Sequence, residues 1–450
     1  MTGVPNGWAT ATLSDLLHRI EAGLNIKCEE RPPVAGERGL VKISAVTWGR
    51  FDEAQSKTMP SDVAADERNR IRTGDLLISR ANTIELVGAS VIVDRIERQL
   101  YLSDKVLRLV VHEPAKRWIN YALKTPELRK EIETASSGNQ LSMRNISQEK
   151  LRGLRMPVAP EAEQVRIADK LDAVLARVDA VNDRFARVAA LIKRFRQSVL
   201  AAATSGRLTE EWRLKQRDPA PWQRIVLADV ARDFGYGSAA KSSKAGDVPV
   251  LRMGNLQAGK LDWADLVFTS DPKEIGKYLL RDGDVLFNRT NSPELVGKSA
   301  VFKGNRQAIF AGYLIRVRCG ECLLPDYLNY NLCAPAGRDY CWRVKSDGVS
   351  QSNINASKLR AFEFDLPSLA EQAEIIRRVE LLFAYADRLD ARLQTAQTSA
   401  ERLTPAVLAK AFRGELVPQD PNDEPASELL RRLRAVTTPG LVKPGRRRAE

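Results

Sequence analysis

The chain has 450 residues, of which 44% are hydrophobic and 28% charged, and its formal net charge is +13. This length favours two to four domains, each large enough for its own core, and the composition is typical of a soluble globular protein. Because no run of 18 apolar residues and no basic segment before an apolar core is present, we expect neither a membrane-spanning helix nor a signal peptide.

Charge and cysteine content narrow the function classes further. The 70 basic residues outnumber the 57 acidic ones, which favours an acidic partner, most often nucleic acid. Five cysteines, an odd number in a large chain, argue against a disulfide scaffold and for a reducing, cytoplasmic location.

Taken in chain order, the sequence is duplicated. Eleven of 23 positions are identical between residues 71–93 and 280–302. Three further pairs of segments match in the same order: 7–23 with 221–237, 145–171 with 353–379, and 198–209 with 406–417. A period near 210 residues is far longer than a solenoid repeat, so the sequence predicts duplication of a whole domain.

The repeated domains are predicted to mix α and β structure. Short β-branched runs predict strands at LVKISAV (40–46), GDLLIS (74–79), GASVIV (88–93) and KVLRLVV (105–111). A helical stretch follows near 115–134 and is broken at Pro126. One sequence does not fix the strand order.

Two long helices give the clearest signal. Apolar residues recur every 3.5 positions, which predicts a coiled-coil seam made of Ile167, Leu171, Val174, Val178, Val181, Phe185, Val188, Ile192, Phe195 and Val199, and of Ile375, Val379, Leu382, Ala386, Leu389, Leu393, Ala396, Ala400, Leu403 and Val407. Pro160 and Glu161 suit a helix start, and Gly206 and Gly414 suit left-handed helix ends. Pro405 should kink or restart the second helix.

The matched length and register of the helices favour pairing with each other over separate packing of each against its own domain. A pseudo-two-fold relation would make the pair antiparallel, with a seam of roughly 50 Å. At ~3.4 Å per base pair, such a rod covers about fifteen base pairs, which suits a bipartite DNA site. The predicted fold class is α/β (α+β), with two similar mixed domains joined by two long antiparallel coiled-coil helices.

Motifs for chemistry are few. DFGYGSA (233–239) superficially resembles a glycine-rich methyltransferase loop, but the preceding LADVARDF is predicted as a helix where such a loop needs a strand. No Asn-Pro-Pro-aromatic tetrapeptide and no GxxxxGK[ST] phosphate loop occurs, and His18 and His112 are the only histidines. Cys319, Cys322, Cys333 and Cys341 have an atypical spacing for zinc and no counterparts in the first repeat, so ordinary thiols are favoured and no metal is expected.

A family resemblance rests on five motifs in order: VPNGW (4–8), IRTGDLLISR (71–80), NISQEKLRGLRMPVAPEAEQVRI (145–167), LPSLAEQAEI (366–375) and GELVPQDPNDEPASELLRRLRA (414–435). Over nearly its whole length the chain resembles the specificity subunit of type I restriction–modification enzymes. The resemblance implies target recognition domains at 1–157 and 221–367, spacer helices at 158–206 and 368–414, and a carboxy-terminal tail at 415–450.

The same resemblance implies the partners. They are double-stranded DNA, two modification (methyltransferase) subunits that carry S-adenosylmethionine and methylate adenine, and restriction subunits that translocate and cleave. This chain would be non-catalytic and would bind no cofactor. The alternatives are a coiled-coil scaffold with two basic domains and no sequence preference, and an enzyme fusion, which the missing motifs disfavour.

Comparison of the repeats sorts the candidate DNA contacts. Residues identical in both repeats cannot distinguish two half-sites, so Arg80, Arg289, Arg108 and Arg316 suit either phosphate contact or a structural hydrogen bond. Base reading must lie where the repeats diverge. The candidates there have side chains that pair with purine edges: Lys27, Lys42, Arg50, Lys57, Gln140 and Arg144 in the first domain, and Lys241, Lys244, Arg252, Asn255 and Gln257 in the second.

Overall fold

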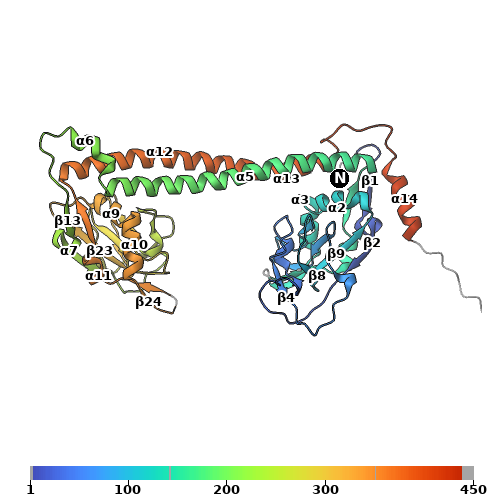
Figure 1. The fold of residues 1–450 in the computed structure, drawn as a ribbon, viewed down its shortest axis with the longest axis horizontal. Helices are drawn as coiled ribbons and strands as arrows, with labels where there is room; N and C mark the ends of the chain where they lie inside the picture. Colours follow the sequence, from blue (N-terminus) through green and yellow to red (C-terminus); the bar gives the residue numbers. More distant parts are fainter. Residues whose placement is uncertain (1–3, 141–142, 350, 438–450) are drawn as a thin grey trace, which may run out of the picture. The chain divides into compact units, whose positions relative to one another are not determined.

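The computed structural model describes residues 4–140, 143–349 and 351–437. Contacts divide the chain into two compact units (Figure 1): unit 1 is Met1–Arg184 with Ala396–Glu450, and unit 2 is Phe185–Thr395. The long helices α5 (Glu161–Thr204) and α12 (Leu369–Glu401) contribute residues to both units. The five-part division expected from the sequence therefore remains a proposal, because the contacts group each end of the helix pair with the domain that it carries.

Unit 1 is built on a four-stranded antiparallel sheet in the order β2 (Leu17–Glu21), β9 (Val106–Val111), β5 (Leu76–Ser79), β7 (Ser90–Ile92). The further sheets described in this unit are β4 (Ser56–Thr58), β3 (Arg38–Val41), β8 (Gln99–Tyr101); β10 (Ser137–Gln140), β11 (Met143–Asn145), β6 (Ala81–Asn82); and β1 (Ala9–Thr12) with β12 (Arg155–Val158). Its shorter helices are α1 (Leu13–Leu16), α2 (Lys116–Ala122), α3 (Pro126–Ala135), α4 (Gln148–Arg152), α13 (Leu403–Phe412) and α14 (Ala426–Thr437).

Unit 2 repeats this layout. Its four-stranded sheet runs β14 (Ala231–Tyr236), β23 (Leu314–Cys319), β19 (Val285–Asn288), β21 (Ser299–Val301), and its other sheets are β18 (Val267–Thr269), β15 (Val248–Leu251), β22 (Ile309–Phe310); β20 (Thr290–Asn291), β25 (Ser352–Asn353), β24 (Ser346–Asp347); β13 (Gln223–Val226) with β26 (Glu363–Leu366); and β16 (Leu256–Gln257) with β17 (Lys260–Leu261). Its shorter helices are α6 (Glu210–Leu214), α7 (Leu227–Val230), α8 (Pro272–Tyr278), α9 (Pro325–Cys333), α10 (Pro335–Val344) and α11 (Ala356–Arg360).

The predicted duplication is confirmed at the level of strand pairing. In both units the middle strand of one three-stranded sheet pairs antiparallel on one side and parallel on the other, as β3 does with β4 and β8 and β15 with β18 and β22. Unit 2 differs mainly in the hairpin β16–β17 and helix α8, which lie in a region where the two sequences diverge.

Three of the four predicted strands in unit 1 are present, and one prediction was wrong. The run at 40–46 leaves the extended conformation after Val41 and continues as a 3₁₀ helix, Ile43–Val46, whose Ala45 and Val46 are buried. The segment 227–234 was also wrong as a helix, because only its first four residues are helical and the rest enters β14. In both cases tertiary packing overrides the local pattern.

The helix ends follow the sequence closely. Gly206 and Gly414 have φ of 76° and 73°, the left-handed conformation predicted for them. The second helix ends at Glu401 and restarts at Leu403, which places Pro405 in the first turn of α13, where its missing N–H costs no helical hydrogen bond.

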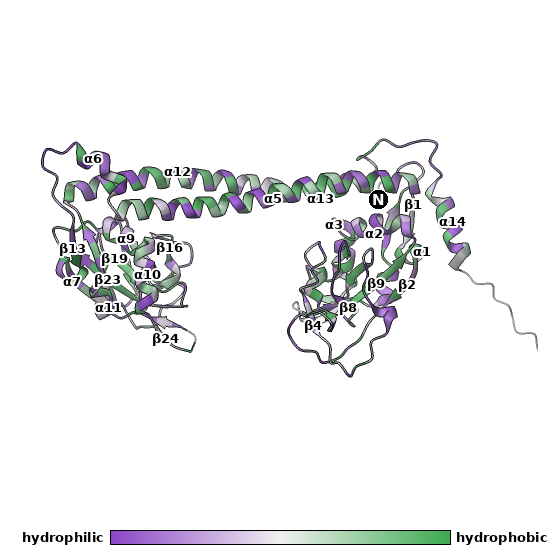
Figure 2. Cartoon of the chain, viewed as in Figure 1, coloured by the Kyte–Doolittle hydropathy of each residue, from purple (hydrophilic) through white to green (hydrophobic). Residues whose placement is uncertain are grey.

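The structure buries one face of each long helix, and apolar and charged residues alternate along both (Figure 2). The buried or half-buried seam positions are Ile167, Leu171, Val174, Val178, Val181, Phe185, Ile192 and Val199 on α5, and Ile375, Val379, Leu382, Ala386, Leu389, Leu393, Ala396, Ala400 and Val407 on α12 and α13. Val188, Phe195 and Leu403 are instead exposed. The first two rotate off the seam because 3.6 residues per turn drifts from a 3.5-residue repeat, and the third because the break at Arg402 resets the phase.

Each unit shows which helix segments meet. In unit 1, Ile167 and Leu171 from the first turns of α5 pack with Leu408 and Ala411 of α13. In unit 2, the last turns of α5 pack with the first turns of α12, in the cluster that contains Val199, Leu200, Ala203, Ile375 and Val379. The two helices therefore pair in opposite directions, as predicted.

A tryptophan, buried in unit 1 and half-buried in unit 2, joins each domain to its helix. The Trp8 indole nitrogen donates to Glu163 Oε2 at 2.9 Å, and the Trp222 indole nitrogen donates to Glu371 Oε2 at 2.9 Å. Glu371 also forms an ion pair with Arg213, whose Nη2 lies 2.8 Å from Oε1. Burial raises the pKa of the Glu163 carboxyl, and the hydrogen bond from Trp8 only partly opposes this.

Replacing each glutamate by glutamine should affect stability differently, because Glu371 has a cationic partner and Glu163 is dominated by its burial. The folded state holds a proton on Glu163 more tightly than the unfolded state does, so this group's contribution is present at low pH and is lost as pH rises through the raised folded pKa. We expect Glu163→Gln, whose amide oxygen still accepts from Trp8, to gain unfolding free energy relative to wild type between pH 4 and 7. Glu371→Gln should lose about 2 kcal/mol at pH 7, because Arg213 loses a charged acceptor. Urea denaturation at several pH values measures both, and equal losses for the two variants would contradict the burial argument.

Candidate nucleic-acid interface

Each unit has a place where one strand of the four-stranded sheet passes into a three-stranded sheet, and an arginine stands at the junction. Arg80 lies between β5 and β6, and Arg289 between β19 and β20. Their backbones are held alike: Arg80 N–H donates to Lys105 O at 2.9 Å and Arg289 N–H to Tyr313 O at 3.0 Å. The carbonyl groups of both arginines accept from the strand hairpin that completes the small sheet.

The side chains at these junctions are half-buried cations without carboxylate partners in the described chain. Arg289 Nη2 lies 3.5 Å from Asn353 Oδ1, and its guanidinium stacks 4.8 Å from the centre of the Tyr236 ring. Within residues 4–140, 143–349 and 351–437, the Arg80 guanidinium has no hydrogen-bond or ion-pair partner. A fixed, uncompensated guanidinium is suited to an anion, phosphate above all.

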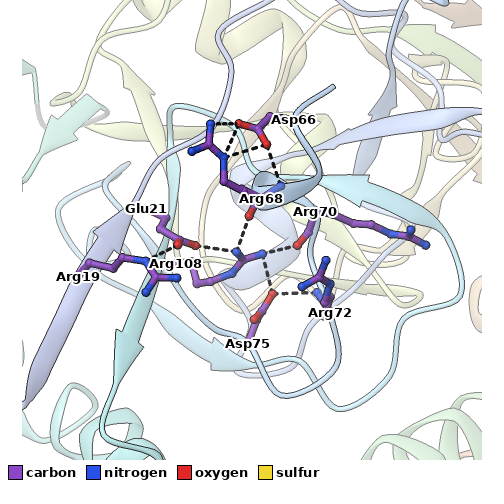
Figure 3. Close-up of polar contacts among 8 residues, drawn as sticks. All are labelled: Arg19, Glu21, Asp66, Arg68, Arg70, Arg72, Asp75 and Arg108. Carbon is purple, nitrogen blue, oxygen red and sulfur yellow. Dashed lines mark hydrogen bonds and ion pairs between the residues drawn. The ribbon is translucent and has the colours of Figure 1, made fainter. Parts of the chain in front are cut away.

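Arg108 has a different role, and Figure 3 shows it at the centre of a polar cluster. Its Nη1 lies 2.7 Å from Glu21 Oε2 and its Nη2 lies 2.8 Å from Asp75 Oδ2. The same group donates to the carbonyl oxygens of Arg68 and Arg70, which holds the 3₁₀ turn Glu67–Asn69 against β9. With 9% of its surface exposed, Arg108 takes the structural of its two predicted roles and is no phosphate contact.

Arg316, the counterpart of Arg108, is also turned inward. It pairs with Asp233 across β14 and β23 and lies 5.7 Å from the Phe310 ring centre. Asp284, the counterpart of Asp75, is instead bound by Arg318, whose Nε lies 2.9 Å from Oδ1. The inward arginine is thus shared by the two repeats, but its partners differ.

Residues 219–395 match the family model described as the type I restriction modification DNA specificity domain. The chain is 30% identical over 456 residues to the StySPI specificity subunit of Salmonella potsdam, with 96% of each chain covered. The chain belongs to the family of type I restriction enzyme specificity subunits. It is also 29% identical to the EcoKI specificity subunit of Escherichia coli strain K12, again over 96% of each chain. A solved chain from a study of complex assembly and conformational transition of the type I R-M system shares its fold, with a TM-score of 0.66 at 18% identity over 92% of this chain and all of that one.

The function is that of a specificity subunit in a type I restriction–modification system. The structure shows the surroundings of the candidate base-reading residues. In unit 1, Lys27 is exposed without an ion-pair partner among the described residues. Lys42 and Lys57 both bind Glu30, at 3.4 Å and 2.5 Å. Because their shared carboxylate is exposed, either lysine can exchange it for another acceptor.

The other unit 1 candidates are engaged in local structure. Arg50 lies 2.7 Å from Asp179 on α5. Arg144 fastens its own hairpin by donating to Ser136 and to the carbonyl oxygen of Gly138, so its guanidinium is committed there. Gln140 lies in β10, but its side chain is outside the described part of the chain.

In unit 2 the specificity subunit exposes Lys241 and Lys244, for which the described residues offer no ion-pair partner. Arg252 Nη2 lies 3.0 Å from Asp265 Oδ2, and Gln257 Oε1 accepts from Lys298 at 2.9 Å. Asn255 was wrong as a candidate: it is 2% exposed and gives both amide hydrogens to the carbonyl oxygens of Asp262 and Asp265, so no base can reach it.

Exposed aromatic residues near the junction arginines were missed. Trp48, 74% exposed, follows Thr47, whose hydroxyl accepts from Asn82 at 3.2 Å and so places it beside the small sheet of unit 1. In unit 2, Tyr236 and Tyr313 are about half exposed on either side of Arg289. Aromatic rings beside uncompensated cations suit nucleic-acid contact. The available signal for Trp48 and Tyr236 was their position in or next to segments where the repeats diverge.

Among the described residues no group of three or more histidine, cysteine, aspartate and glutamate side chains is placed to hold a metal ion. Burial raises the pKa of the Cys319 thiol to about 12 and that of Cys341 to about 11, so these thiols are protonated at neutral pH. No helix in the described ranges combines the length and apolar character needed to cross a membrane.

The two inward arginines should differ in their contribution to stability. Arg108→Met removes the cation from two partly buried carboxylates, Asp75 and Glu21, of which Glu21 keeps the exposed Arg19, and we expect a loss of about 3 kcal/mol in the free energy of unfolding. Arg316→Met frees only Asp233, which is nearly half exposed, and should cost about 1 kcal/mol. Chemical denaturation of the full chain measures both. A loss for Arg316→Met as large as that for Arg108→Met would show that the pairing geometry does not set the effect.

Proposed function

We propose that this specificity subunit reads a split DNA target, with one half-site bound by each domain. The proposed recognition domains are residues 1–157 and 221–367. The observation that carries the proposal is that both domains share one sheet framework and one junction arginine, while the segments attached to them differ. A shared framework suits the same sugar–phosphate backbone, and differing segments suit two different sequences.

In this proposal Arg80 and Arg289 bind phosphate groups next to the bases that are read. The exposed lysines Lys27, Lys241 and Lys244, for which the described ranges show no ion-pair partner, contact bases or neighbouring phosphates. Trp48 supplies apolar contact in one half-site, and the Tyr236–Arg289 stack fixes the angle of the guanidinium in the other.

The remaining expectations from the family resemblance are proposals of the same kind. The paired helices, at about 158–206 and 368–414, set the distance between half-sites and dock two modification subunits. Those subunits bind S-adenosylmethionine and methylate adenine, and restriction subunits translocate and cleave DNA. This chain contributes recognition in the cytoplasm and no catalysis.

A genome-wide map of N6-methyladenine in the host, with and without this gene, tests the proposal. We expect one split motif to lose methylation on deletion, because the modification subunits no longer find their target. Complementation with the wild-type gene is the control and should restore the same motif. If no motif changes while the modification subunits are expressed, the scaffold without sequence preference becomes the better account.

Substitution of the junction arginines tests the phosphate contacts. Each of Arg80→Ala and Arg289→Ala, in complex with the modification subunits, should weaken target DNA binding about tenfold and reduce the salt-dependence slope by about 1. Arg413→Ala and Arg224→Ala remove exposed, carboxylate-paired arginines from the same units and are the charge-matched controls. Fluorescence anisotropy over a range of salt concentrations provides the measurement, and control variants with the same slope change would contradict a specific role.

A further inference from the structure

A cavity of about 410 Å³ lies in unit 2 between α9, α12 and the turn 258–261. Its walls include apolar side chains from Leu200 and Phe383 and polar groups from Tyr330 and Glu380. Cys333, at the end of α9, also lines it. A volume of this size is within the range of small-molecule sites.

The other repeat shows what fills the equivalent place in unit 1. The two domains are aligned by the same buried hydrogen bond, from Ser90 to Asn120 at 3.0 Å and from Ser299 to Asn329 at 2.7 Å. Counting along the helix from these asparagines, Tyr121 corresponds to Tyr330 and Lys124 to Cys333. The tryptophan-bound Glu163 and Glu371 align the long helices in the same way, so Asp172 corresponds to Glu380.

In unit 1 the equivalent side chains pair with one another. Arg117 Nη1 lies 2.7 Å from carboxylate oxygens of both Asp169 and Asp172, and the Tyr121 hydroxyl donates to Asp172. The Lys124 ammonium approaches the Tyr121 ring at 5.9 Å. Burial lowers the pKa of Lys124, while Asp172 and a second helix carboxylate oppose that shift. An alkyl chain with an ammonium group therefore occupies the joint between domain and helix.

In unit 2 the carboxylate is kept, but the positions aligned with Arg117 and Lys124 are not basic. Lys260 and Lys303 line the cavity, and they are paired with Asp387 and Asp326. Asp326 stands in place of Arg117 and Cys333 in place of Lys124. Asp326 is bound by Lys303 at 2.7 Å, but Glu380 has no hydrogen-bond or ion-pair partner in the described ranges. The Tyr330 side chain is 8% exposed and lines the cavity, and its hydroxyl likewise has no partner among the residues described.

We propose that this cavity binds a primary alkylammonium ion, of which a short aliphatic diamine is the fitting class. The ammonium group would supply Glu380 with the cation that Arg117 supplies to Asp172 in unit 1, and the Tyr330 hydroxyl would be a second acceptor. The Tyr330 and Phe383 rings add cation–π attraction, and the alkyl chain packs on Leu200. The inference does not depend on how the domains read DNA.

The test uses the full chain, without DNA, and 1,4-diaminobutane as the probe, with 1,4-butanediol as its uncharged match. Isothermal titration should show saturable binding of the diamine to the wild type and none of the diol. Glu380→Gln should weaken binding at least tenfold, because the charged acceptor is lost. Glu321→Gln, a strongly exposed carboxylate in the same unit that does not line the cavity, should leave affinity unchanged.

A second pair of variants tests the residue difference between the two repeats at Cys333. Cys333→Lys places an ammonium chain where unit 1 has Lys124 and should abolish diamine binding, whereas Cys333→Ala keeps the cavity and should retain it. If Cys333→Lys fails to fold, the Glu380→Gln and Glu321→Gln comparison still decides. Equal affinity across these variants, or equal binding of diol and diamine, would overturn the proposal.

Discussion

A hydrogen bond from a tryptophan indole to a buried glutamate, made once in each unit, is the constraint on which the architecture depends. Trp8 and Trp222 stand at the start of their domains, and Glu163 and Glu371 lie in the first turn of the helix that leaves each domain. A buried carboxylate is tolerated only when such donors satisfy it. The bond therefore forms only when the chain has returned to the first strand of its domain, and it fixes the direction in which the helix departs.

The chain segment that packs beside this tryptophan–glutamate hydrogen bond differs between the two units. In unit 2, Arg213 from the segment after α5 reaches Glu371 and stacks 5.2 Å from the Trp222 ring. In unit 1, the segment after α13 supplies Asp423, which lies 2.5 Å from Arg166, and Leu430, which enters the domain core. Each domain is thus closed by chain that follows the opposite long helix, so residues 415–437 are part of the fold of unit 1.

The sequence was most informative where a feature repeats with a fixed period or depends on one residue's backbone. The 3.5-residue spacing predicted both helices, and Gly206, Gly414 and Pro405 predicted their ends because glycine readily adopts a positive φ and proline fixes φ near about −65°. Strand order and ion pairs have no such signature, since they depend on which side chains face each other after folding. Arg108 and Asn255 illustrate this: as single letters they suit DNA contact, and only their buried partners show otherwise.

Some basic residues of the diverged loops form ion pairs with the long helices, which leaves fewer basic residues available to contact DNA. Arg50 in unit 1 and Lys260 in unit 2 come from unrelated segments, yet they bind Asp179 and Asp387, which are equivalent positions of the two long helices. These bridges are exposed, so each contributes at most about 1 kcal/mol and orients its loop more than it stabilises the fold. A cation held in this way is neutralised locally. The attraction for a polyanion must then come from cations without internal carboxylates, and among the predicted candidates these are the junction arginines and the unpaired lysines of the diverged segments.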